Sequence, residues 1–271
     1  MRIAQILTPT GPAFGVLVGS DIRLFAGAPD YHSVVTGPPP LTDTVIALAD
    51  AQLLAPVQRP GKIVAIGLNY MDHCREQNVA PPEKPLIFTK FTTAINRPGG
   101  VIEWSAALTQ QVDFEAELAV VIGKTARRVS EAEALDYVFG YTVANDVSAR
   151  DLQFSDKQWV RGKSLDTFCP MGPWLVTADE LPDPQTLPIR CEVNGQRLQN
   201  SITAEMIFPV RALIAFCSQA FTLEPGDIIL TGTPHGVGVF REPQIFLQDG
   251  DAVTVTIEGI GSLSNTCRII D

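Results

Sequence analysis

The chain has 271 residues, of which 45% are hydrophobic and 18% are charged, as in a packed globular protein rather than a disordered one. Twenty basic and thirty acidic side chains leave a net charge of −10, which argues against nucleic acid or an anionic membrane as the main partner. Five scattered cysteines, an N-terminus without a signal-peptide pattern and only short apolar runs predict a cytoplasmic protein.

The first 58 residues predict a small β-rich module. Short strands are expected at Ile3–Leu7, Phe14–Val18 and Ile22–Phe25, and a short helix is expected over Thr44–Leu53. The stretch Pro56–Gly61, rich in proline and glycine, then interrupts the pattern. We therefore expect a boundary near residue 58, with residues 59–271 forming a larger second domain.

The larger part mixes many strands with few helices. Asn194 and Gly195 predict a tight hairpin turn, because both tolerate positive φ. A helix is expected over Met206–Phe221, with Pro209 in its first turn. Strands are expected at Lys62–Gly67, Leu86–Lys90, Phe114–Gly123, Val138–Val143, Leu187–Val193, Asp227–Leu230, Ala252–Ile257 and Thr266–Ile270. Because strands and helices do not alternate, we expect a β-rich α+β fold rather than a doubly wound sheet.

Two glutamates open one of these strands. Glu115 and Glu117 are two residues apart, so a strand places them on the same face, and Asp113 would continue the row. The strand then runs into Leu118–Ile122, a composition typical of burial on both faces. Two buried carboxylates must either take up a proton or share a cation. The alternative is a solvated sheet edge whose charges point at water.

Asp146 follows the next apolar strand and has two interpretations. It could cap a helix that begins at Val147, or it could supply a third oxygen ligand beside Glu115 and Glu117. Three carboxylates without a neighbouring His or Cys suit Mg²⁺, Mn²⁺ or Ca²⁺ rather than zinc. Such an ion would keep open positions for water or for a chelating substrate.

Other polar residues could serve the same site. Arg150 and Gln153 share a helical face and could hold a substrate carboxylate, or they could form an ordinary exposed surface. Lys163 could neutralise an enolate or simply be solvated. His73 and Glu76 would touch on a helix, either as a general base for water or as a surface ion pair.

From Lys62 to the C-terminus the chain resembles the fumarylacetoacetate hydrolase family. It looks closest to the fumarylacetoacetate hydrolase domain-containing proteins with a short N-terminal extension. The resemblance is carried by Gly67–Tyr70 with His73, Asp113–Gly123, Asn145–Gln153, Gly162-Lys163 with Gly172-Pro173, and Thr231–Pro234 with Gly236–Gly238. It implies a mixed β-sandwich roll, usually a homodimer.

The resemblance also implies roles for individual residues. The family's ligands for a divalent metal, Mg²⁺ or alternatively Mn²⁺, correspond to Glu115, Glu117 and Asp146. The family's residues that hold the substrate's acid group correspond to Arg150 and Gln153, and Thr233 lies in a turn that lines the same pocket. The family's catalytic residues correspond to Lys163 and to the dyad of His73 and Glu76, which activates water on a segment that closes over the substrate.

The function expected on this basis is metal-dependent hydrolysis of a carbon–carbon bond in a 2,4-dioxo acid such as an acylpyruvate. The reaction would use a metal-chelated enolate and a water activated by His73 and Glu76. Decarboxylation, isomerisation of a hydroxymuconate-type dioate and ureidoglycolate-type lyase chemistry are alternatives on the same core. A ligand-binding protein that kept the fold without turnover is the alternative from a different class.

Overall fold

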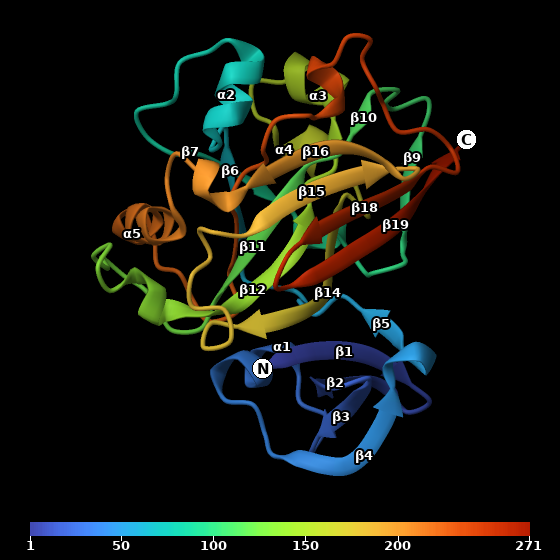
Figure 1. The fold of residues 1–271 in the computed structure, drawn as a ribbon, viewed down its shortest axis with the longest axis vertical. Coiled ribbons are helices and arrows are strands. Elements are labelled where there is room, and N and C mark those ends of the chain that lie inside the picture. The colour runs from blue at the N-terminus through green and yellow to red at the C-terminus, as the bar shows by residue number, and fades with distance from the viewer.

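The computed structural model describes residues 1–271 and has three β-sheets (Figure 1). The strands are β1 (Arg2–Thr8), β2 (Gly11–Val18), β3 (Asp21–Phe25), β4 (Leu41–Ala47), β5 (Gln52–Leu54), β6 (Ile63–Gly67), β7 (Leu86–Lys90), β8 (Ile95–Asn96), β9 (Val101–Ser105), β10 (Val112–Asp113), β11 (Ala116–Ile122), β12 (Val138–Asn145), β13 (Ser148–Ala149), β14 (Cys169–Thr177), β15 (Pro188–Val193), β16 (Gln196–Ile202), β17 (Ile228–Leu230), β18 (Ala252–Ile257) and β19 (Gly261–Ile270). The α-helices are α1 (Tyr31–Thr36), α2 (Met71–Gln77), α3 (Arg150–Ser155), α4 (Val160–Lys163) and α5 (Val210–Ala220).

The main sheet has twelve strands in the order β4-β3-β2-β1-β14-β12-β11-β17-β6-β7, with β5 paired to β1 and β8 paired to β14. The second sheet has the order β16-β15-β18-β19-β9, and β10 pairs with β13. This is the β-rich α+β fold that the sequence predicts. No helix combines the length and the apolar character that crossing a bilayer requires.

The N-terminal strands β1, β2 and β3 lie where the sequence predicts them. The helix predicted over Thr44–Leu53 is wrong, because this segment forms β4, a 3₁₀ turn and β5. Val45 and Ile46 are β-branched, and Ile46 pairs with Ile22 of β3, so sheet pairing prevails over the helical spacing. The helix that does form is α1, whose start is capped by Asp30 accepting a hydrogen bond from the Ser33 N–H.

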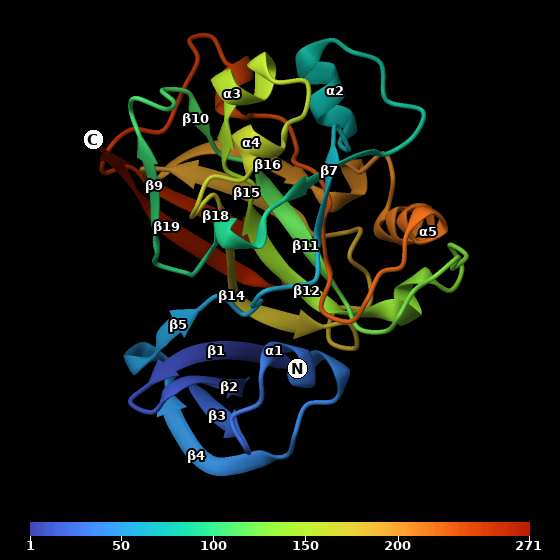
Figure 2. The same cartoon turned by 180° about the vertical axis from the view of Figure 1, so that it is seen from behind.

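The N-terminal strands belong to the main sheet, together with strands of the larger part of the chain. Ile3 of β1 pairs with Leu175 of β14, so the sheet continues from one part of the chain into the other (Figures 1 and 2). We retain a division near residue 58 as a proposal about the organisation of the chain. Under it, residues 1–58 would be an extension whose first strand is anchored on the second domain.

Strand β11 runs through the middle of the molecule and is buried on both faces, as its composition predicts. Leu118 and Val120 belong to the larger apolar core, which also contains residues of the five-stranded sheet. Ala119 and Val121 belong to a second core, which also contains residues of β1 and α1. A strand with apolar packing on both sides is held rigidly, and so is whatever its end presents.

Two other local predictions concern a turn and a helix. The hairpin at Asn194 and Gly195 is confirmed, with φ of 52° and 78°. Helix α5 begins directly after Pro209, whose ring is tolerated there because no helical hydrogen bond needs its nitrogen. The predicted start at Met206 is wrong, since Met206 instead forms a β-bridge with Tyr70.

Several strand ends meet at one edge of the main sheet. The first residue of β11, Ala116, pairs with the last residue of β12, Asn145. Strand β17 ends at Leu230 opposite Ala119, and β6 runs parallel to β17. The loops that follow β6, β12 and β17 therefore converge beside the start of β11. Helices α2, α3 and α4 lie at this end of the molecule, opposite the N-terminal strands (Figures 1 and 2).

Replacement of Asp227 tests a buried polar contact of the fold. Its fully buried carboxylate accepts hydrogen bonds from the N–H groups of Lys62 at 3.0 Å and Glu224 at 2.7 Å, and Lys62 Nζ lies 2.5 Å away. Asp227→Ala should lower the free energy of unfolding, measured by urea denaturation, by about 2 kcal/mol, because it removes the acceptor of two part-buried N–H groups and the nearest partner of the Lys62 ammonium. The control Asp43→Ala, which removes an exposed partner of Arg23, should leave the unfolding curve unchanged. Equal curves for both variants would contradict this assignment.

Candidate functional site

Three carboxylates meet at the converging strand ends. Oxygen atoms of Glu115, Glu117 and Asp146 all lie within 4.8 Å of one another. Their exposed fractions are 6%, 1% and 0%, so the solvated sheet edge considered as an alternative is ruled out. Glu117 is the second residue of β11, Glu115 directly precedes the strand, and Asp146 directly follows β12. Chain segments some thirty residues apart thus bring like charges together inside the protein. Buried negative charges of this kind must be paired with cations or protonated.

Asp113 does not continue this row, contrary to the sequence-based expectation. It ends the separate strand β10, and its carboxylate accepts hydrogen bonds from the N–H groups of Gly238 and Val239 at 2.8 and 3.0 Å. It also accepts from Arg150 Nε at 2.9 Å. The regular alternation of a strand is broken at Phe114 and Glu115, which lie between β10 and β11. Asp113 therefore supports Arg150 from outside the cluster of three acids.

Asp146 does not cap a helix, because strand β13 intervenes and α3 begins only at Arg150. Its two oxygens instead contact two buried lysines: Lys90 Nζ lies 2.5 Å from Oδ1 and Lys163 Nζ lies 2.9 Å from Oδ2. Lys90, the last residue of β7, was not identified from the sequence. The only signal was a lysine that ends an apolar strand, and such lysines ordinarily point to solvent.

Lys163 links two of the acids. Its Nζ donates to Glu115 Oε2 at 2.7 Å and to Asp146 Oδ2 at 2.9 Å. Burial alone would lower the pKa of Lys163, but the two carboxylates outweigh it and raise the pKa, so the amine stays protonated. Gly162 permits this placement, because a Cβ there would lie 2.7 Å from the backbone nitrogen of Gln153. Only glycine lets α4 approach α3 this closely.

Arg150 is buried and has one unused donor. Nη1 contacts Glu115 Oε1 at 2.7 Å and donates to Gln153 Oε1 at 2.9 Å, and Nε donates to Asp113. The shared helical face predicted for Arg150 and Gln153 is confirmed. Nη2 is buried without any hydrogen-bond partner in the protein. A buried guanidinium N–H that lacks an acceptor is costly, and both Arg150 and Gln153 line a pocket, so an acceptor from a ligand would satisfy it.

The acids differ sharply in their electrostatic environment. Burial would raise the pKa of Glu115, but Lys163 and Arg150 lower it to about 2. Burial, together with Asp146 and Glu115, raises the pKa of Glu117 well above its ordinary value of 4.5. The only hydrogen bond to the Glu117 carboxylate comes from the Gly232 N–H at 2.8 Å. Glu117 is thus the member of the cluster that most lacks a positive partner.

A divalent cation fits this donor set. When all of them are ionised, the four buried carboxylates, Asp113 included, face three buried cations, Lys90, Lys163 and Arg150, which leaves one negative charge in excess. Three close carboxylate oxygens without nitrogen or sulfur ligands suit a hard ion. A doubly charged ion would turn the local excess from −1 to +1, which favours an anionic ligand in the remaining positions.

His73 and Glu76 form the contact that their spacing predicts. Both lie on α2, with His73 Nδ1 2.8 Å from Glu76 Oε2, and their side chains are only 9% and 15% exposed. The surface ion pair considered as an alternative is therefore excluded. Because a carboxylate only accepts, Nδ1 carries the proton and Nε2 is the free basic nitrogen of the neutral ring. The second oxygen of Glu76 accepts a hydrogen bond from the Gly236 N–H at 2.8 Å.

These groups surround a cavity of about 260 Å³. Its polar lining comprises His73, Gln77, Glu115, Glu117, Arg150, Gln153, Lys163 and Thr233. Its apolar lining includes Leu68, Phe88, Trp159 and Phe240, and the His73 and Phe240 rings lie 5.7 Å apart. Asp146 lies beneath Lys163 rather than at the cavity surface. Every other residue predicted for the site except Glu76 therefore faces this one cavity.

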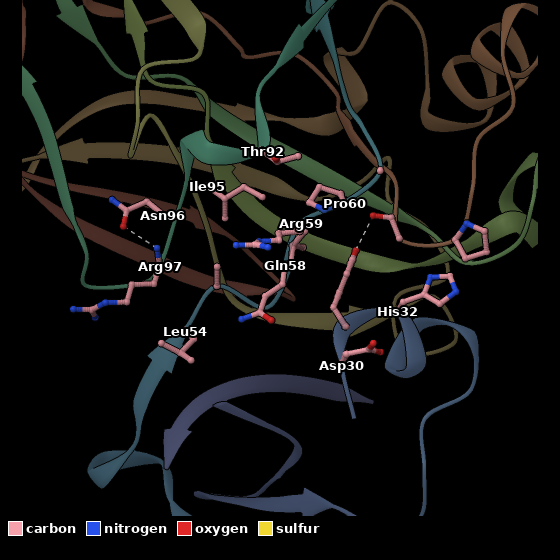
Figure 3. A pocket seen from close by; sticks show the side chains of 16 residues that line it. Asp30, His32, Leu54, Gln58, Arg59, Pro60, Thr92, Ile95, Asn96 and Arg97 are labelled. Carbon is pink, nitrogen blue, oxygen red and sulfur yellow. Dashed lines mark hydrogen bonds between the residues drawn. The ribbon is translucent and has the colours of Figure 1, made fainter. Parts of the chain in front are cut away.

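A larger groove of about 900 Å³ lies between the N-terminal strands and the rest of the molecule (Figure 3). Residues such as His32, Arg59 and Arg97 line it, and no residue predicted for the site does. It contains no group of three metal-binding side chains. The chemistry indicated by the sequence thus belongs to the smaller cavity.

Comparisons with known proteins agree with this geometry. The family model for the fumarylacetoacetate hydrolase C-terminal domain matches residues 62–268, and the Rv2993c-like N-terminal model matches residues 1–56. The mitochondrial oxaloacetate tautomerase fahd2 of Xenopus laevis is 52% identical over 82% of this chain and 70% of its own length. Human mitochondrial oxaloacetate tautomerase FAHD2A is 45% identical over 98% of this chain and 91% of its own length. With mitochondrial relatives such as these, a cytoplasmic location stays a prediction.

Solved structures show the same relationship. A fumarylacetoacetate hydrolase from Exiguobacterium antarcticum superposes with a TM-score of 0.92 at 38% identity, with both chains fully covered. A 5-carboxymethyl-2-hydroxymuconate delta-isomerase from Mycobacterium smegmatis superposes with a TM-score of 0.87 at 41% identity, again over both full chains. The fold, the order of the motifs and the family model over most of the sequence lead to one conclusion: the chain belongs to the fumarylacetoacetate hydrolase family.

Proposed function

We propose that the chain catalyses metal-dependent interconversion of the enol and keto forms of a short 2-oxo acid of the oxaloacetate type. The observation that carries this proposal is the buried group Glu115, Glu117 and Asp146 at a small cavity that His73 also lines. The names of the frog and human relatives support tautomerisation of oxaloacetate in particular. The cavity of about 260 Å³ has room for a four-carbon acid.

Metal binding is assigned to Glu115, Glu117 and Asp146, with Mg²⁺ the preferred ion and Mn²⁺ the alternative. When bound, such an ion polarises the oxygen at carbon 2 of the acid and makes a hydrogen on carbon 3 more acidic. The three carboxylates fit this ion because their charges are incompletely balanced by the neighbouring lysines and arginine. No other side chain of the cavity is needed as a ligand.

The remaining polar residues are assigned to the substrate. Arg150 would use its unpartnered Nη2 to bind a carboxylate, beside the amide of Gln153. Lys163 stays protonated and would stabilise negative charge on the enolate oxygen. Thr233, whose hydroxyl accepts a hydrogen bond from Gln199 at 2.8 Å, would line the pocket.

His73 is assigned the proton transfer at carbon 3. Its Nε2 would remove a proton from carbon 3 of the keto form or return one to carbon 3 of the enol, while Glu76 holds the ring through Nδ1. The balance is simple, because one proton leaves carbon 3 and one joins the oxygen at carbon 2, or the reverse. Tautomerisation consumes neither water nor a second substrate.

Hydrolysis of an acylpyruvate, the function expected from the sequence, is the second candidate. The His73 and Glu76 pair favours it, because the same Nε2 could instead take a proton from water. Decarboxylase, isomerase and lyase reactions would use the same residues to bind the acid and stabilise its enolate. A protein that binds the ligand without turnover would use them for binding alone. Assays of enol loss, acid release and CO₂ release on a panel of 2-oxo and 2,4-dioxo acids, with Mg²⁺ and with a chelator, separate these functions.

Replacement of His73 tests the proposed proton transfer. His73→Ala should reduce kcat for ketonisation of enol-oxaloacetate by about 10²- to 10⁴-fold, because general acid–base catalysis typically contributes this factor. The rate is measured as the loss of enol absorbance. Mg²⁺ affinity should stay close to that of the wild type, since no proposed ligand is changed. The control His32→Ala alters an exposed histidine of α1 and should behave as the wild type. Undiminished turnover by His73→Ala would refute the assignment.

Replacement of Glu117 tests the proposed metal site through stability rather than activity. Because the pKa of Glu117 is raised in the folded state, the metal-free wild type should lose stability as the pH rises above 4.5. Glu117→Gln removes this titration, so the metal-free variant should melt at or above the wild-type temperature, with a difference that grows as the pH rises above 4.5.

The same variant should lose its response to metal. Mg²⁺ at about 100 times its Kd should stabilise the wild type by about 2.7 kcal/mol and Glu117→Gln hardly at all. The control Glu258→Gln changes an exposed carboxylate and should keep the full Mg²⁺ response. An equal rise in melting temperature in Glu117→Gln and the wild type would exclude Glu117 as a ligand.

A further inference from the structure

Helix α2 carries His73 and Glu76 but is poorly stabilised by itself. It has only seven residues, no side chain caps its N-terminus, and it ends at Asn78 in the left-handed conformation with φ of 52°. Isolated helices of this length are not stable in water. The position of the His73 ring therefore depends on the contacts that hold α2 against the rest of the chain.

Two acidic side chains, one turn apart on α2, provide such contacts. Asp72 accepts hydrogen bonds from His235 Nδ1 at 2.9 Å, from the His235 N–H at 3.3 Å and from the Ser201 hydroxyl. Glu76 accepts from the Gly236 N–H at 2.8 Å. Residues four apart share one helical face, so both carboxylates accept hydrogen bonds from the same loop turn, at His235 and Gly236. We call these contacts of Asp72 and Glu76 with His235 and Gly236 the α2 anchor.

The turn that receives α2 is itself firmly placed. Gly236 has φ of 98°, and a Cβ there would lie 2.2 Å from the Leu198 carbonyl oxygen, so the backbone packs tightly against β16. The same loop supplies the Gly232 N–H to Glu117 and the Thr233 side chain to the cavity. The α2 anchor thus connects the helix of His73 to the loop that supports a proposed metal ligand.

We propose that His235 is a positioning residue of this site: through Asp72 it holds α2 so that His73 faces the cavity. The catalytic part of this inference rests on the proposed function. His235 does not line the cavity and its side chain is 44% exposed, whereas Asp72 is 11% exposed. Because carboxylates only accept, His235 must present a protonated Nδ1 to Asp72. The chemistry required at position 235 is therefore a short side chain with one N–H donor.

Three variants test this requirement. His235→Ala removes the donor, His235→Asn keeps an N–H at a similar distance from the backbone, and Asp72→Ala removes the acceptor. The first readout is hydrogen exchange at the amides of Cys74 and Val79, whose hydrogen bonds close α2. We expect exchange about tenfold faster in His235→Ala and Asp72→Ala, and close to the wild-type rate in His235→Asn. His32→Ala is the matched control.

Kinetics provide the second readout. In His235→Ala, kcat for enol-oxaloacetate should fall about tenfold with Mg²⁺ affinity unchanged, because His73 is displaced while the acids are not. His235→Asn should recover most of kcat. The double variant with Asp72→Ala should be no slower than Asp72→Ala alone, because Asp72→Ala already removes the acceptor of the His235 side chain.

The outcomes separate the two proposals. Unchanged amide exchange in His235→Ala would overturn the positioning role. Equal increases in exchange rate and equal losses of kcat in His235→Asn and His235→Ala would also overturn it. A wild-type enzyme inactive on every 2-oxo acid would overturn the proposed function, while exchange would still decide whether His235 holds α2. Faster exchange with unchanged kcat would show that the anchor holds α2 without serving catalysis, and this too would overturn the proposal.

Discussion

The site depends on one constraint: its closely packed, buried carboxylates must be neutralised by neighbouring cations. Four carboxylates and three cations are packed in and beneath the lining of one small cavity, and each contact between them is made at hydrogen-bond distance. Removing any partner would leave an uncompensated buried charge, which proteins tolerate poorly. The group nevertheless has one carboxylate more than it has cations, and Glu117 is the carboxylate without a cationic partner. A built-in deficit of this kind favours a cation from solution.

The fold makes this crowding possible by supplying rigid supports. Strand β11 is buried on both faces, so Glu115 and Glu117 leave the sheet from a fixed position. Asp146 follows the paired end of β12, and the loop after β17 comes back beside them. By contrast, α2 is short and lies outside the sheet, and hydrogen bonds that its acidic side chains accept from His235 and Gly236 hold it in place. The site therefore combines a rigid floor with a separately attached helix.

The relatives limit the reactions to be considered for this chain, but choosing among them depends on the geometry of the site. Members of one family carry names as different as tautomerase, isomerase and hydrolase. The shared element in our proposal is an acid-bound metal that stabilises an enolate, while the fate of the proton or of water depends on His73 and its surroundings. In this proposal, therefore, the placement of α2 decides more about the reaction than the three acids do.

Much of this protein was predictable from its amino-acid sequence, because the signals were local. The composition of β11, the Asn194-Gly195 turn and the three-residue spacing of His73 and Glu76 each depend on neighbours in the chain. Tertiary structure alone decided that Asp113 supports Arg150, that Lys90 reaches Asp146, that residues 44–47 and 52–53 pair as strands and that His235 holds Asp72. These contacts join residues far apart in sequence, so they depend on how strands and loops pack in three dimensions, which a local sequence pattern does not specify.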